Sequence, residues 1–405
     1  MMLPSISGND YLGRHVIAAV ISIFIVVAGT VAPNLAVAAQ KCEFVLTNAQ
    51  MDERRTHLKG LLKEKRYAAL EDEFEAKQLK VQRGVLSDEM LRLDFEAAFD
   101  NDMAIEPLLS EWVNLYPRSY SARIARAYHY VSSGYAKRGD RFASETSREQ
   151  FEAMERQFEK ARADLDQALH LNEKSTLAHA KQLGLARSTG AYGGVDKVLD
   201  EANKKFGKSL AIKVAAVVSL NPKWGGSFEK LDRLVEFAKA SGMGIDAVTT
   251  LKFRVEIEKG NYYEVATKQL ARATHHYRLA GEVCETYLPW EAAMRTSYEI
   301  EDWDNLIIAA DRLLKLDPTI GWAIQRRGWA FEKTGKMIRA IKDYDVAADL
   351  GNPWAQNKLG WILWQGTDAP KDKIRAKLLF EQAAVQGNSN AQANLKALNA
   401  ELGKH

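Results

Sequence analysis

One short pattern near the carboxyl end of the chain constrains the fold more than any other feature. Trp322 is followed six residues later by a Gly-Trp pair, and the same arrangement begins again at Trp354, 32 residues further on. Apolar residues recur at intervals of three and four here and throughout the chain from about residue 47, which predicts amphipathic helices. Short helix pairs cannot bury their apolar faces alone, so the pattern predicts repeats that stack on one another.

The two repeats resemble known helical-repeat families. The first is similar to a tetratricopeptide repeat and the second, from Ala355 to Gly387, to a Sel-one-like repeat. The residues that carry the two resemblances are glycines, aromatic residues and small residues at the spacing of those families: Gly328, Phe331, Gly335, Ala340, Tyr344 and Ala347, then Leu359, Gly360, Gly366, Ala376, Ala383 and Ala384. Ile324 and Arg327 depart from the usual Trp and Leu. The resemblance implies an all-α superhelical solenoid of antiparallel helix pairs.

The middle of the chain carries a second resemblance. Its elements are Trp112 with Pro117 and Ser119, the helix that begins with Ala125, and the Pro-x-Trp-Gly-Gly-Ser loop from Pro222 to Ser227. Together they resemble an uncharacterised bacterial domain family over roughly Leu61 to Gly242. The resemblance implies a fold related to helical repeats and no specific activity.

These patterns predict four segments. They are a signal peptide at 1–39, a helical domain of degenerate repeat-like helix pairs at 40–250, connecting helical repeats at 251–318, and the tetratricopeptide and Sel-one-like repeats at 319–402.

The amino-terminal segment has the order of a secretory signal. Arg14 precedes an apolar run from Val16 to Val31, and Ala36-Val37-Ala38 offers a cleavage site, so we expect cleavage just before Ala39 or Gln40. The alternative is an uncleaved anchor in the inner membrane, although the run is shorter than the roughly 20 apolar residues of a usual span. Cleavage predicts a periplasmic or secreted protein with no remaining membrane span.

Two cysteines, Cys42 and Cys284, would both reach that oxidising compartment. They can form one disulfide between the amino-terminal end and a distant helix. The alternative is one buried and one exposed thiol, because two cysteines without diagnostic spacing do not define a bridge.

Charge and composition argue against several function classes. The formal net charge is only +3 and its charges alternate in sign, which is unlike the basic surface of a nucleic-acid binder. The histidines lack partners at metal-ligand spacing: His275 and His276 are adjacent, so on a helix they point about 100° apart. The sequence therefore predicts neither a metal site nor a cofactor.

The loop at Trp224-Gly225-Gly226-Ser227 has two interpretations. It lacks the Gly-x-Ser-x-Gly order of a nucleophile elbow and the glycine spacing of a phosphate-binding loop. The favoured interpretation is a structural corner in which Ser227 caps the next helix, the glycines adopt positive φ, and the Trp224 ring is buried. A ligand site is the alternative.

A possible peptide-binding face lies among the repeats. Tryptophans and amides at helical spacing would share one face of the first helix of each repeat: Trp322, Gln325 and Trp329, then Asn357, Trp361 and Trp364. Such a face suits an extended peptide or a helix. Plain packing between adjacent repeats is the alternative, and the favoured one.

The sequence predicts an exported, non-catalytic interaction scaffold or adaptor with a protein or peptide partner in the cell envelope. The alternative is a periplasmic hydrolase that acts on the cell wall or a glycan through an unrecognised carboxylate. The identity of the partner and the oligomeric state do not follow from the sequence.

Overall fold

The computed structural model describes residues 45–139 and 145–403, and these residues form nineteen α-helices with no β-strand. The all-α fold class predicted from the sequence is confirmed. The apolar stretch Ile212–Val218, whose β-branched residues could suggest a strand, lies in a helix, α9. The predicted signal peptide at 1–39 and Cys42 lie outside the described residues.

The chain divides into two compact units, one that ends at Glu258 and one that begins at Lys259. This boundary falls inside a helix, α11, close to the predicted boundary at residue 250. The segments predicted at 251–318 and 319–402 share the second unit from Lys259 onward. None of the helices in the described part of the chain combines the length and apolar character needed to cross a bilayer.

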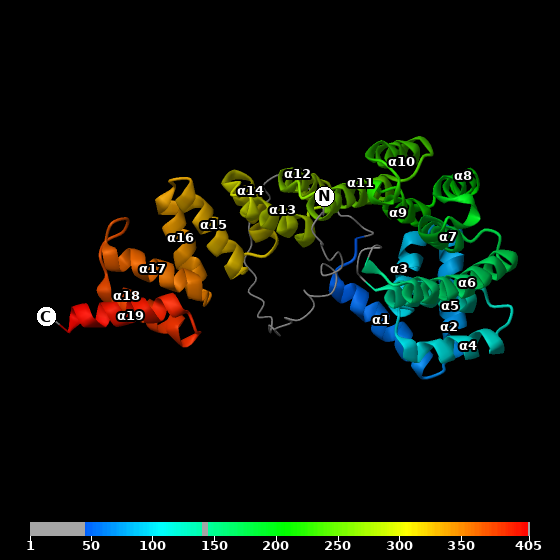
Figure 1. The fold of residues 1–405 in the computed structure, drawn as a ribbon, viewed down its shortest axis with the longest axis horizontal. Coiled ribbons are helices and arrows are strands. Elements are labelled where there is room, and N and C mark those ends of the chain that lie inside the picture. Colours follow the sequence, from blue (N-terminus) through cyan, green and yellow to red (C-terminus); the bar gives the residue numbers. More distant parts are fainter. Residues whose placement is uncertain (1–44, 140–144, 404–405) are drawn as a thin grey trace. The chain divides into compact units, whose positions relative to one another are not determined.

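The second unit is a succession of helices of similar length, each packed on the next (Figure 1). After α11 and a π-helical turn at Tyr262–Ala266 come α12 (Leu270–Val283), α13 (Tyr287–Glu299), α14 (Trp303–Leu316), α15 (Gly321–Lys333), α16 (Met337–Asp349), α17 (Pro353–Gln365), α18 (Lys373–Val385) and α19 (Ser389–Leu402). The two repeats predicted from the sequence are the pairs α15–α16 and α17–α18. Short turns with positive φ at Gly335 and Gly366 join the helices of each pair.

The first unit also begins with helix pairs but adds contacts between helices distant in sequence. Its helices are α1 (Asn48–Lys63), α2 (Tyr67–Gln82), α3 (Asp88–Ala98), α4 (Glu106–Leu115), α5 (Tyr120–Arg138), α6 (Arg148–Leu171), α7 (Thr176–Thr189), α8 (Val195–Phe206), α9 (Leu210–Ser219), α10 (Phe228–Ala240) and the start of α11 (Ile245–Asn261). The short helix α3 packs against α1, α2, α5, α7 and α9, which makes it the central helix of the unit.

Because α3 is surrounded, four of its five charged side chains, Asp88, Glu89, Arg92 and Asp94, are buried, and only Glu96 is exposed. Glu89 accepts two hydrogen bonds from Arg92, at 2.6 and 2.8 Å, and Arg92 also pairs with Glu96. Desolvation acts to raise the pKa of Glu96, but the charges of Arg92 and Lys181 outweigh it and lower that pKa to about 2. An unpaired charge in this position would cost several kcal/mol, so the pairs permit a charged helix to lie at the centre.

A glycine that faces an aromatic ring sets the distance between helices in several pairs. A Cβ atom added to Gly134 on α5 would lie 2.6 Å from the ring of Phe158 on α6. In the second unit a Cβ on Gly328 would lie 2.8 Å from the Tyr344 ring, and one on Gly360 would lie 2.8 Å from the Phe380 ring. Real Cβ atoms do not approach a ring so closely, so only glycine permits this helix spacing.

We expect the substitution Gly134→Ala to lower the free energy of unfolding by about 1–3 kcal/mol, because the added methyl group overlaps the Phe158 ring. Gly184 is the matched control. It also lies inside a helix of the first unit, but a Cβ there meets no atom within 4 Å. Gly184→Ala should raise the free energy of unfolding by up to about 1 kcal/mol. Urea denaturation followed by circular dichroism measures both changes, and equal effects would contradict the proposed contact.

Candidate functional site

The residues predicted to form a peptide-binding face come from α15 and α17, which are the first helices of the two repeats. The start of α17 is fixed by Asn352, whose side chain accepts a hydrogen bond from the Ala355 N–H at 2.9 Å. Lys358 Nζ on α17 lies 2.7 Å from Glu332 Oε1 on α15, so the two helix faces are neighbours. The predicted residues do not, however, all play the same part.

Trp329 belongs to a chain of ring contacts that joins successive helices. Its ring centroid lies 5.3 Å from that of Tyr298 on α13, 6.0 Å from Trp303 on α14 and 5.7 Å from Trp354 on α17. Tyr344 on α16 contacts Trp354 at 5.6 Å. These distances are typical of favourable aromatic pairs. For Trp329 the structure therefore favours packing between repeats over an open binding surface.

Trp364 and Asn357 make contacts with the last helix of the chain. Trp364 Nε1 donates a hydrogen bond of 2.6 Å to Glu401 Oε2, and the Trp364 ring stands edge-on to Phe380. Asn357 Oδ1 accepts a hydrogen bond of 2.9 Å from Asn394. Hydrogen bonds from Lys373 and then Trp364 lower the pKa of Glu401. These two predicted residues therefore connect α17 to α19.

The remaining predicted residues are more accessible. Trp361 is 41% exposed, with Lys358 Nζ 5.7 Å from its ring centroid. Trp322 and Gln325 on α15 are half-buried. Tryptophan is enriched at the surfaces where proteins bind one another, relative to the rest of the protein surface.

Cations alternate with the rings on this side of the helices. The Arg326 guanidinium lies 4.9 Å from the Tyr298 ring and 5.4 Å from the Trp322 ring. Lys333 Nζ lies 5.9 Å from the Trp329 ring. Neither cation forms an ion pair with a carboxylate in the described part of the chain. We call the resulting surface the aromatic strip and define it by Tyr298, Trp322, Gln325, Arg326, Trp329, Lys333, Lys358 and Trp361.

Tyr298 was missed by the sequence analysis although the sequence contains a signal for it. It stands 31 residues before Trp329, which itself stands 32 residues before Trp361. The repeat therefore extends one unit further toward the amino terminus than the Gly-Trp pattern suggests, because Ser297 replaces the glycine there. Because Ser297 breaks the Gly-Trp pattern, the repeat that contains Tyr298 is not apparent from that pattern.

The loop from Asn221 to Ser227 forms a tight corner in the first unit. Ser227 caps α10 by accepting a hydrogen bond from the Lys230 N–H, as expected. Gly225 has the expected positive φ of 83°, but Gly226 does not. Gly226 is required for a different reason: an added Cβ would overlap the carbonyl group of Leu220.

The expectation that this corner buries Trp224 is wrong. Trp224 is 42% exposed, and its ring lies beside two cations, with the Arg187 guanidinium at 5.0 Å and Lys223 Nζ at 5.4 Å. The 3-10 turn at Pro222–Trp224 places this ring at the surface, while Gly226, which has no side chain, lies against Leu220.

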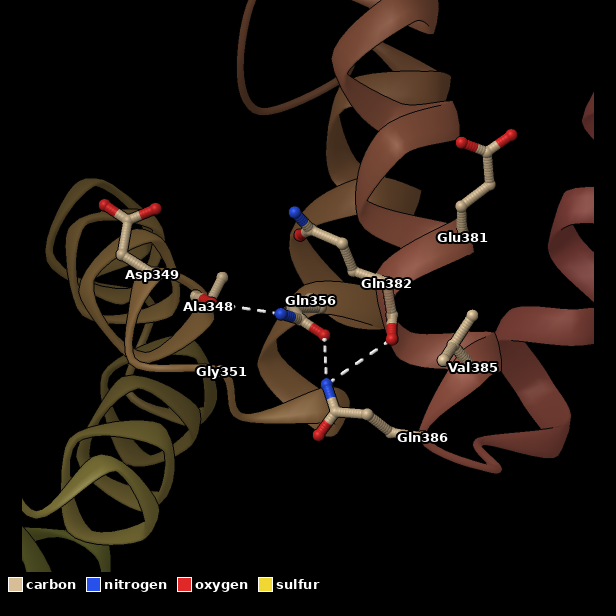
Figure 2. Close-up of a pocket in the computed structure, with 8 residues that line it drawn as sticks. All are labelled: Ala348, Asp349, Gly351, Gln356, Glu381, Gln382, Val385 and Gln386. Atoms are coloured by element: carbon tan, nitrogen blue, oxygen red, sulfur yellow. Dashed lines mark hydrogen bonds between the residues drawn. The ribbon is translucent and has the colours of Figure 1, made fainter.

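A depression of about 650 Å³ lies between α16, α17 and α18. Figure 2 shows the Gln356 amide at its centre, joined by hydrogen bonds to Ala348 and to Gln386. Gln356 donates to the Ala348 carbonyl at 3.1 Å and accepts from Gln386 at 3.0 Å. Asp349 and Glu381 stand on either side on different helices. No group of three metal-ligating side chains occurs here or elsewhere in the described ranges. The amide contacts thus connect α16, α17 and α18.

Cys284 is fully buried and follows the last residue of α12. Its proposed partner Cys42 lies outside the described residues, so the disulfide stays a prediction.

Comparison with protein families supports the resemblance of the middle region. Residues 54–195 match a family model described as a domain of unknown function, DUF4034. The DUF4034 match begins in α1 and ends at the start of α8, before the loop at Trp224. A comparison with curated proteins found no match.

Solved structures of helical-repeat proteins are similar to this chain at low identity. A Sel1 repeat protein from Oxalobacter formigenes is 17% identical, with 92% of this chain and 98% of that chain covered and a TM-score of 0.31. The protective antigen c5321 of uropathogenic Escherichia coli, which displays an SLR fold, is 16% identical over 73% of this chain and 68% of that one, at a TM-score of 0.30. The human IFIT1 dimer with PPP-AAAA is 13% identical over 90% and 97%, at a TM-score of 0.35.

The different surroundings of Trp329 and Trp361 predict different effects of their removal. Trp329→Ala should lower the free energy of unfolding by about 3 kcal/mol, because three aromatic contacts are lost. Trp361→Ala should lower it by about 1 kcal/mol or less, since that ring faces solvent. Chemical denaturation of each variant followed by circular dichroism tests this. Similar losses for both variants would assign Trp361 to the core as well.

Proposed function

We propose that this protein is an exported, non-catalytic interaction module whose aromatic strip binds a segment of a partner protein in the cell envelope. The observation that carries the proposal is the exposed ring of Trp361 beside Lys358, at the end of a strip of rings and cations. We assign no catalytic residue, cofactor or metal to the chain.

The chemistry of the strip suggests the kind of segment that it binds. Tryptophan, tyrosine and arginine dominate binding energy at protein interfaces because they combine a large apolar area with a polar group. Gln325 lies one turn from Trp322 and Trp329 on the same helix, and an amide can pair with the backbone of an extended peptide. Arg326 and Lys333 can each donate hydrogen bonds to a carboxylate of the bound segment. The strip therefore suits an extended segment with apolar and acidic side chains.

The strip can bind without large rearrangement of the repeats. Trp329 holds its neighbours through ring contacts on three helices, and Lys358 is held by Glu332 at 2.7 Å. A surface whose side chains are already ordered loses less conformational entropy on binding. The packed ring of Trp329 thus holds the helix that carries the accessible ring of Trp361.

Photo-crosslinking in the native cell tests this proposal. A photoreactive residue at position 361 should capture one dominant envelope protein, because the Trp361 side chain lies in the strip and faces solvent. A probe at position 385 is the matched control: Val385 is 90% exposed and lies on α18, outside the strip. The adduct should be absent from position 385 and should decrease when Arg326→Gln is combined with the probe at 361.

Two results would contradict the proposal. The first is no adduct from position 361 in a folded and exported protein. The second is release of soluble fragments from purified cell wall by the chain, undiminished in Trp361→Ala, which would support a hydrolase.

Export and the disulfide form a separate prediction from the sequence. Protein recovered from the native cell should begin at Ala39 or Gln40, and non-reducing peptide mapping should recover Cys42 and Cys284 in one linked pair. Intact mass spectrometry before and after reduction measures both. A chain that starts at Met1 in the membrane fraction would indicate a retained anchor, and two free thiols would exclude the bridge.

A further inference from the structure

The corner at Trp224 borders a cavity of about 230 Å³ in the first unit, separate from the aromatic strip. Its walls come from the end of α7, the start of α8, the end of α9, the loop and α10. We propose that this cavity binds a small oxyanion, a carboxylate or a phosphate group, and that Arg187 is its principal contact. This site is independent of the proposed function of the strip.

Arg187 is positioned by aromatic residues instead of by a carboxylate. Its guanidinium lies 5.0 Å from the Trp224 ring and 5.8 Å from the Tyr135 ring, and Nη2 donates a hydrogen bond of 2.7 Å to Tyr135 Oη. It forms no ion pair with any carboxylate among residues 45–139 and 145–403. Its Nε is buried and has no hydrogen-bond partner there. A guanidinium held in this way retains donors for an oxyanion such as a carboxylate or a phosphate group.

The charged side chains that line the cavity are Arg187, Lys230 and Asp196, which leave an excess of one positive charge. Lys230 Nζ lies 2.8 Å from both carboxylate oxygens of Asp196, so those two charges neutralise each other. Lys223 lies 5.4 Å from the same Trp224 ring as Arg187 and, like Arg187, has no ion pair in the described part of the chain. Two cations beside one ring repel each other, and a bound anion would relieve that repulsion.

The start of α8 adds to this potential. Val195 and Asp196 line the cavity, and the preceding N-cap residue, Gly194, has no side chain to satisfy the first N–H groups of this twelve-residue helix. Free N–H groups at a helix start carry partial positive charge and favour an anion. This contribution supports the cations and would not define a site without them.

The loop is held in one conformation, which favours a preformed cavity. Asn221 accepts a hydrogen bond from the Lys223 N–H at 2.7 Å, and its Nδ2 donates to Glu258 at 2.9 Å. Gly226 lies directly against Leu220, another residue of the cavity wall. The volume is below the roughly 300–1,000 Å³ of pockets for larger ligands, so the cavity suits one small group.

Thermal denaturation of the purified mature chain tests the site with two probes, inorganic phosphate and succinate. Sodium chloride at matched ionic strength corrects for general salt effects. We expect a saturable rise in Tm with at least one probe. A response to phosphate alone would identify a phosphate site, and a response to succinate alone would identify a carboxylate site.

Substitutions assign the binding to the cavity. Arg187→Gln should weaken binding at least about tenfold, because it removes a charged hydrogen-bond donor. Arg162→Gln is the matched control: Arg162 also lies beside a ring, that of Tyr192, and also has a buried Nε without a partner, but it does not line the cavity. Arg162→Gln should bind each probe as the unmodified chain does.

A second variant keeps the test decisive if Arg187→Gln fails to fold. Lys223 is exposed, so Lys223→Gln should fold normally and weaken binding a few-fold through the loss of one nearby charge. No rise in Tm beyond that of chloride would overturn the proposal. So would unchanged affinity in the folded Arg187→Gln or Lys223→Gln variants, or an equal loss in Arg162→Gln.

Discussion

The contact between a helical glycine and an aromatic ring on the next helix determines how this protein is built. It joins α5 to α6 at Gly134 and Phe158, α15 to α16 at Gly328 and Tyr344, and α17 to α18 at Gly360 and Phe380. The missing side chain lets the ring fill the space between the helices, and an aromatic ring buries a large apolar area.

The same position in successive repeats can be packed in one and open in the next. Trp329 directly follows Gly328, and Trp361 directly follows Gly360. Only Trp329 is covered by a tryptophan of the next repeat, Trp354. Ala355 corresponds to Ala391, so the position of Trp354 corresponds to Asn390 on α19. Asparagine provides no ring to cover Trp361, which stays 41% exposed. The available surface thus arises where the aromatic pattern of the repeat ends.

Periodicity predicted the helices and the repeats, because these depend on residues close together in the chain. It could not predict which ring is covered, since that depends on the neighbouring helix. Trp224 shows the same limit: the two glycines that follow it indicated a corner, but its place at the surface beside Arg187 of another helix has no signal in the local sequence. Contacts between helices distant in sequence, such as α3 with α9, have no periodic signal at all.

The arginines in the described part of the chain fall into two groups: those whose charge is paired with a carboxylate of the protein, and those whose charge remains free to bind a ligand. Arg126 is held by Asp164 and Arg327 by Asp343, each through two hydrogen bonds of 2.7–2.8 Å, and these bonds raise the pKa of both arginines. Such bidentate pairs use the guanidinium to connect helices. Arg187 and Arg326 also lie beside rings, but neither has a carboxylate partner among the described residues, so a ring orients the guanidinium without neutralising it. Arg187 lines the proposed oxyanion cavity, and Arg326 belongs to the aromatic strip, so each unneutralised charge lies at a site proposed to bind a ligand.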